Sequence, residues 1–158
     1  MTNASADSGH LKQPIAISNW LYFVAFMVFI MVVVGGITRL TESGLSITEW
    51  KLITGALPPL NEAAWLAEFE KYKLIPEFIE INGPAGMTLA EFKFIYFWEW
   101  FHRQWARIMG LVFVIGFVVF SYKGYFNRRA YCWLGAIVGL AALAASFGWI
   151  MVASGLED

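Results

Sequence analysis

Residues 20–38 read WLYFVAFMVFIMVVVGGIT, and this stretch contains no charged side chain. A helix of that length covers about 28 Å, close to the ~30 Å hydrocarbon core of a bilayer. We therefore predict a transmembrane helix here, with Trp20 and Tyr22 in an interfacial aromatic belt at its start. The length of the apolar run and the absence of a small-residue cleavage motif after it favour a retained helix over a cleaved signal peptide.

The composition of the whole chain is also typical of a membrane protein. Of its 158 residues, 59% are hydrophobic and only 15% are charged, against about 25% charged in soluble domains. The charges avoid residues 108–120 and 130–153. We predict further helices over 89–122 and 130–153, and hence an all-α membrane protein with three transmembrane helices. The net charge of −1 gives no indication of nucleic acid binding.

The connection over residues 39–87 is polar and too long for an ordinary turn. Within it, Asn61 is suited to cap a helix over 61–73 whose aromatic residues recur at helical spacing on one face. Two interpretations of this amphipathic helix stay open. It can lie on the membrane or cover the bundle, or it can be a solvated helix that packs on its own loop.

The second long helix has a defined start and is longer than a bilayer requires. Thr88 and Glu91 form a capping-box pattern. A helix over 89–122 would extend about 50 Å, so its first turns are expected to stand outside the hydrocarbon. His102 and Arg103 lie near the aromatic-rich start of this helix.

The short loops predict an orientation. Lys123, Arg128 and Arg129 lie between the second and third helices, and the positive-inside rule places them in the cytoplasm. A flexible tail over 1–17 is then cytoplasmic too, while the 39–87 loop lies outside, in a periplasm. The membrane would be a cell inner membrane crossed several times.

Glu99 and His102 are the candidate chemical residues. They are three positions apart and so share a helix face. A neutral imidazole facing a bundle interior can act as an axial ligand of haem iron, and Arg103 and Arg107 could pair with haem propionates. The alternative is plain: His102 is an interfacial residue, and Glu99 with Arg103 is an ordinary intrahelical ion pair.

Five motifs in order resemble the haem A synthase family of bacteria and mitochondria. They are Gly35-Gly-Ile-Thr-Arg-Leu-Thr-Glu-Ser-Gly-Leu-Ser46, Trp50-Lys-Leu-Ile-Thr-Gly-Ala-Leu-Pro-Pro-Leu60, Glu91-Phe-Lys-Phe-Ile-Tyr96, Glu99-Trp-Phe-His-Arg103 and Gly148-Trp-Ile-Met-Val-Ala-Ser-Gly-Leu156. The resemblance extends from about residue 18 onward. The outer loop has no cysteine pair, which favours the proteobacterial and mitochondrial branch.

The resemblance implies an oxidoreductase that converts the C8 methyl group of haem O to a formyl, giving haem A for cytochrome oxidase. It implies an eight-helix fold of two four-helix bundles, the first holding haem O and the second a haem b cofactor. His102 matches the first histidine ligand of the leading half, and Glu99 matches the acidic residue beside it, taken as catalytic. Arg103, Arg107 and Arg39 are expected to bind propionates or anchor the loop.

The sequence departs from the family in one respect: the second histidine of this half and the remaining helices are not in the 158 residues. We expect a fragment, a truncated product or one piece of a split enzyme, inactive without the remaining helices or a second copy. Haem O synthase and oxidase assembly factors are the other expected partners, besides the lipid bilayer. The alternative function is a non-catalytic haem-binding or oxidase-assembly module.

Overall fold

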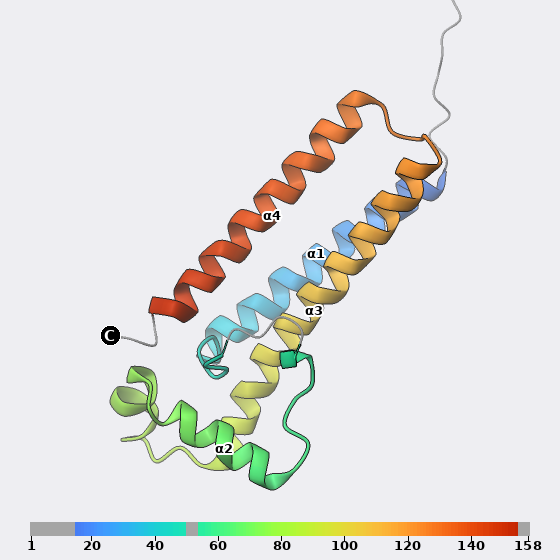
Figure 1. Ribbon diagram of the computed structural model, residues 1–158. Helices are drawn as coiled ribbons and strands as arrows, with labels where there is room; N and C mark the ends of the chain where they lie inside the picture. The colour runs from blue at the N-terminus through green and yellow to red at the C-terminus, as the bar shows by residue number, and fades with distance from the viewer. Residues whose placement is uncertain (1–14, 50–53, 155–158) are drawn as a thin grey trace, which may run out of the picture.

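The computed structural model describes residues 15–49 and 54–154, so most of the predicted 1–17 tail lies outside the described residues. Every regular element in the described part is helical (Figure 1). The elements are α1 (Ile15–Leu40), η1 (Thr54–Ala56), α2 (Glu62–Tyr72), η2 (Phe78–Asn82), α3 (Leu89–Tyr122) and α4 (Arg128–Ser154). Helices α1, α3 and α4 are each long and apolar enough to cross a membrane. The prediction of an all-α protein with three transmembrane helices is confirmed.

The first helix starts earlier than the apolar run suggested. It begins at Ile15 rather than near Trp20, so the last residues assigned to the tail are helical, and Ile17 is buried. The reason is that residues 15–19 contain nothing that breaks a helix; Ile17 lines a cavity together with Ala130 and Leu134 from the start of α4.

Helices α1 and α3 run side by side in opposite directions (Figure 1). Two tryptophans, one on each helix, join them. The Trp20 indole N–H donates to the backbone oxygen of Val112 at 3.2 Å, and the Trp105 indole N–H donates to that of Met27 at 2.9 Å. Each carbonyl in a helix has a second lone pair available for such a bond. The two bonds, one from each helix, set the axial register of the pair.

The Trp20 ring lies over Gly116, where a Cβ would come within 2.1 Å of the indole nitrogen. A glycine in α3 thus makes the space that the Trp20 ring occupies, and the ring is partly buried there. Tyr22, by contrast, is 76% exposed. The place of both residues in an interfacial aromatic belt stays a prediction.

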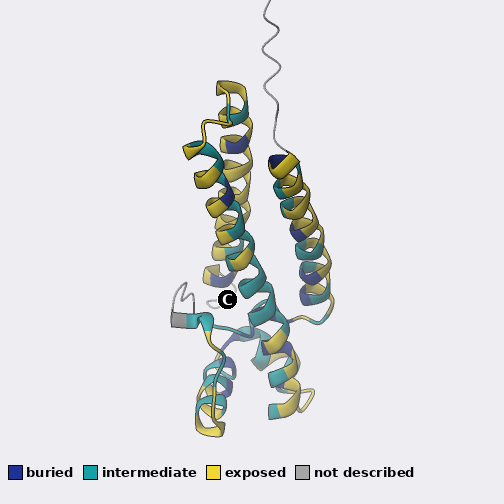
Figure 2. Ribbon diagram, turned by 90° about the vertical axis from the view of Figure 1, so that its right-hand side faces the viewer, coloured by how far each residue is buried: buried dark blue, intermediate teal, exposed yellow. Residues whose placement is uncertain are grey.

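Helix α4 touches the α1–α3 pair only sparsely. Leu134 and Val152 are its buried residues, one near each end, and most of its other side chains are exposed (Figure 2). A Cβ on Gly135 or Gly139 would meet nothing within 4 Å. These two glycines of α4 therefore lie against no described residue.

Helix α2 packs against the first turns of α3 and forms a small core with them (Figure 1). The buried residues of this core are Phe69, Tyr72, Ile75, Phe92, Ile95 and Tyr96. The Phe69 and Phe92 rings stack with centroids 4.9 Å apart, and Trp65 meets Tyr96 edge-on at 5.0 Å. The amphipathic face of α2 therefore covers the first turns of α3, so that this end of α3 packs with the connection between α1 and α3.

The N-termini of α2 and α3, which both follow α1 in the chain, are capped. The Asn61 side chain accepts a hydrogen bond from the Ala64 amide at 2.8 Å, which starts α2. Thr88 and Glu91 form the complete capping box at the start of α3. These local bonds fix where each helix enters the core.

We expect Gly116→Ala to destabilise the helix pair by about 1–3 kcal/mol, because the new methyl group would overlap the Trp20 indole. Gly110→Ala is the matched control, since a Cβ there meets nothing within 4 Å and alanine favours the helix by up to ~1 kcal/mol. Equilibrium unfolding in detergent micelles, followed by circular dichroism, measures both. Equal stability of the two variants would contradict the packing of Trp20 described above.

Candidate functional site

The chain leaves α1 through a tight turn that sends it back toward α3. The Ser43 amide donates to the Thr38 carbonyl at 3.0 Å, the Glu42 amide donates to that of Arg39 at 3.4 Å, and Glu42 has a φ of 51°. This is the hydrogen-bond pattern of a Schellman motif, with a glutamate where glycine is usual. The turn buries Ser43 completely and starts a loop over residues 41–49 that lies against α3.

The Glu99 carboxylate is the point at which this loop meets α3. It is only 3% exposed. One of its oxygens accepts hydrogen bonds from the Ser46 hydroxyl at 2.7 Å and the Ile47 amide at 2.6 Å. The other oxygen pairs with Arg103, one turn further along the helix. A buried carboxylate is costly unless it is hydrogen-bonded and paired, and here three donors meet that need.

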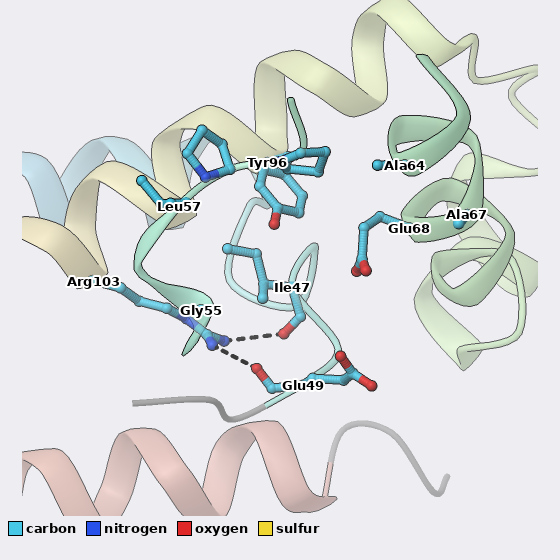
Figure 3. Close-up of a pocket in the computed structure, with 11 residues that line it drawn as sticks. Ile47, Glu49, Gly55, Leu57, Ala64, Ala67, Glu68, Tyr96 and Arg103 are labelled. Carbon is cyan, nitrogen blue, oxygen red and sulfur yellow. Dashed lines mark hydrogen bonds between the residues drawn. The ribbon is translucent and has the colours of Figure 1, made fainter. Parts of the chain in front are cut away.

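Arg103 holds the same loop a second time. Its two terminal nitrogens donate to the backbone oxygens of Ile47 and Glu49, both at 3.0 Å (Figure 3). The planar guanidinium can serve Glu99 and two carbonyls at once because it carries five N–H donors. The ion pair considered from the sequence is present, and it clamps the loop to the helix as well.

A cavity of about 270 Å³ opens between the loop, α2 and α3 (Figure 3). Its polar lining side chains are Glu49, Glu68, Tyr96 and Arg103, and His102 does not line it. Lys71 joins the two glutamates, at 3.3 Å from Glu49 and 2.8 Å from Glu68. The hydrogen bond to Glu68 raises the pKa of Lys71, so the lysine stays charged. The cavity is therefore lined mainly by the connection between α1 and α3, and it is separate from the histidine.

The His102 side chain points across to α1 instead. A Cβ built on Gly35 would lie 3.5 Å from His102 Nε2, and 3.8 Å from the neighbouring ring carbon. The imidazole is half-buried and forms no hydrogen bond with any described residue. Nε2 is therefore the ring nitrogen that faces Gly35, and it has no hydrogen-bond partner among the described residues.

Glu99 and His102 were predicted to share a helix face, and in the structure their side chains point in two directions. Positions three apart differ by about 60° around a helix, and this is enough to aim Glu99 at the loop and His102 at α1. The two candidate residues thus occupy adjacent but different contacts.

The other predicted ligands are more scattered. Arg107 pairs with Gln104 on its own helix, and Arg39 lies exposed in the last turn of α1. Arg39 is four residues beyond Gly35, hence one turn further out on the same face. Within 15–49 and 54–154, no three His, Cys, Asp or Glu side chains gather as a metal-binding group.

Three features of the site were missed from the sequence: the Gly35 contact and the two loop donors, Ser46 and Ile47. The only available signal was the Gly35-Gly36 pair inside an apolar helix, where each glycine costs about 1 kcal/mol relative to alanine and so suggests a packing reason.

Elsewhere in the connection between α1 and α3, burial and the nearby Glu42 raise the pKa of Glu77 to about 7.

Comparison with known proteins places this arrangement in a family. The model of the COX15-CtaA cytochrome oxidase assembly proteins matches residues 18–158. The chain belongs to this family. It is 54% identical to the haem A synthase of Sphingopyxis alaskensis, over 99% of the chain and 45% of the relative, and 54% identical to that of Rhodospirillum centenum, over 100% and 42%.

The family of the chain agrees with the one that its motifs resemble, and its three apolar helices make it a multi-pass membrane protein. The haem A synthase of Flavobacterium psychrophilum is 51% identical over 94% of the chain and 44% of the relative. The chain spans less than half the length of these three relatives. No solved structure matches the chain.

We expect Arg103→Met to lower the free energy of unfolding by about 3 kcal/mol, because it leaves the Glu99 carboxylate buried without its counter-charge. Arg39→Met, at the exposed end of α1, is the control and should change it by less than ~0.5 kcal/mol. Denaturant titration in detergent micelles gives both values. A similar small effect of both substitutions would mean that the clamp contributes nothing to stability.

Proposed function

We propose that the chain forms the haem O site of a haem A synthase, an oxidoreductase that converts the C8 methyl group of haem O to a formyl and so makes haem A for cytochrome oxidase. The observation that carries the proposal is the His102 imidazole, which faces a glycine between two apolar helices, in a family whose named relatives are haem A synthases. Activity would require further helices, completing an eight-helix fold whose second half holds haem b.

The residues around His102 suit a haem. The ring has no competing hydrogen bond within the described residues, the facing position is a glycine, and a neutral imidazole is a common axial ligand. In the proposal, His102 holds the haem iron, and Arg39 and Arg107 pair with the propionates. Arg103, already bonded to Glu99 and two carbonyls, keeps the loop in place over the site. Bound haem O would supply both the iron and the methyl group that is oxidised.

Glu99 is proposed as the acidic residue that bears on the oxidation. Its position three residues before His102 supports this, as does its burial. Both of its oxygens are engaged by Ser46, Ile47 and Arg103. A direct part in proton transfer would therefore require at least one of these bonds to open, most simply the one from the Ser46 hydroxyl.

We propose that the chain lies in the cell inner membrane with the α3–α4 turn and the N-terminus on the cytoplasmic side. Lys123 lies in this turn, and Arg128 and Arg129 lie in the first turn of α4. Helix α2 lies at the other end of the α1–α3 pair (Figure 1). The loop over 39–87 would then be periplasmic. Haem O synthase and oxidase assembly factors are the proposed partners, along with haem O and the bilayer.

The second candidate is a haem-binding or assembly module without catalysis. It is favoured because the described residues contain one histidine, His102, so that a second histidine ligand would come from elsewhere. Two copies could hold one haem between their His102 side chains. Product analysis separates the candidates, since only the enzyme converts haem O to haem A.

We expect His102→Ala to abolish haem binding, measured as the Soret shift of haem titrated into the detergent-solubilised chain. Exogenous carbon monoxide, added after reduction, can fill the coordination position opposite the histidine. The control is His10→Ala, which removes the only other histidine of the chain and should leave the titration unchanged. Binding that survives His102→Ala would contradict the assignment of this residue.

We expect Glu99→Gln to lower haem A formation about 100-fold in the chain joined to the rest of the Rhodospirillum centenum relative. The Soret spectrum should stay unchanged, because glutamine can still accept from Ser46 and Ile47 and so retain the loop. Ser46→Ala serves as the control, since it weakens the same contact without changing charge. If turnover survives Glu99→Gln, or falls equally in Ser46→Ala, Glu99 acts only by holding the loop.

A further inference from the structure

The space on α1 opposite His102 is defined by a single position. A Cβ on Gly35 would lie 3.5 Å from His102 Nε2, whereas one on the next residue, Gly36, would meet nothing within 4 Å. A separation of 3.5 Å is ordinary van der Waals contact. An alanine at position 35 is therefore compatible with the helix pair as it stands, and the helix itself gains from the replacement.

The same position behaves differently once a metal is bound to the imidazole. We propose that Gly35 is a positioning residue of the site. Its missing side chain keeps open the space beside His102 Nε2 that the haem iron and its macrocycle would need. This inference rests on the proposed function. A metal–imidazole bond is about 2 Å long, on the measure of zinc sites. A metal at that distance, with a flat macrocycle around it, would compete with a side chain on Gly35 for one space.

The helix pair cannot easily move apart to make that room. The Trp105 indole holds the backbone of α1 at Met27 from one side, and Trp20 holds α3 at Val112 from the other. Along α1, Met27 lies about two turns from Gly35, and Trp20 lies further away than Met27. At the other end, the Glu99 and Arg103 clamp fixes the loop that follows α1. With the backbones held, the size of residue 35 decides what fits beside His102.

The test compares Gly35→Ala, Gly36→Ala and His102→Ala in the detergent-solubilised chain. The first readout is thermal unfolding without haem, followed by circular dichroism. We expect both glycine variants to unfold at or above the wild-type temperature. The second readout is titration with haem, reduced and exposed to carbon monoxide, followed at the Soret band. We expect Gly35→Ala to weaken haem binding at least ~10-fold, and Gly36→Ala to change it less than ~2-fold.

Each other outcome has one meaning. Equal haem affinity of the two glycine variants, with binding lost in His102→Ala, would overturn the role of Gly35 and leave His102 as the ligand. A lower unfolding temperature of Gly35→Ala than of Gly36→Ala would also overturn it, because the contact would then be needed for folding alone. Binding that persists in His102→Ala, or no binding by the wild-type chain, would overturn the proposed function and this inference together.

Discussion

The buried carboxylate of Glu99 is the interaction on which the arrangement of this chain depends. It receives the Ser46 hydroxyl, the Ile47 amide and the Arg103 guanidinium at a position that is 3% exposed. A carboxylate in such a place is unfavourable without these donors, so the bonds that satisfy it also attach the loop to the helix. The loop begins directly after α1, and its attachment therefore also fixes the C-terminal end of α1 against α3.

Helix α3 extends without interruption to both sides of that contact. The first turns of α3 are covered by α2 in an aromatic core, while its later turns run along α1. His102 lies between these two parts, next to Gly35, where the covered entrance gives way to the apolar helix pair. Helix α4 adds little to this framework, because its described contacts lie near its two ends. The candidate site thus depends on the α1–α3 pair and on the clamped loop.

Much of the local structure could be predicted from the sequence. The apolar runs, the Asn61 cap and the Thr88–Glu91 capping box depend on neighbouring residues, and all of them appear in the structure. The partners across the chain could not be predicted in this way. Ser46 and Glu99 are 53 residues apart, and no periodicity in either segment indicates the other. For the same reason the packing of the Trp20 ring beside Gly116 could not be predicted. The candidate role of His102 depended on the resemblance in its motif, while its contact with Gly35 required coordinates.

The central claim is that His102 is the haem ligand of this chain, and iron–nitrogen vibration tests it most directly. The chain has two histidines, so uniform labelling with nitrogen-15 histidine changes few atoms. Resonance Raman spectra of the reduced, haem-loaded chain should contain an iron–imidazole stretching band that moves to lower frequency with the label and is retained in His10→Ala. A band that does not move, or one that is lost in His10→Ala and kept in His102→Ala, would contradict the account.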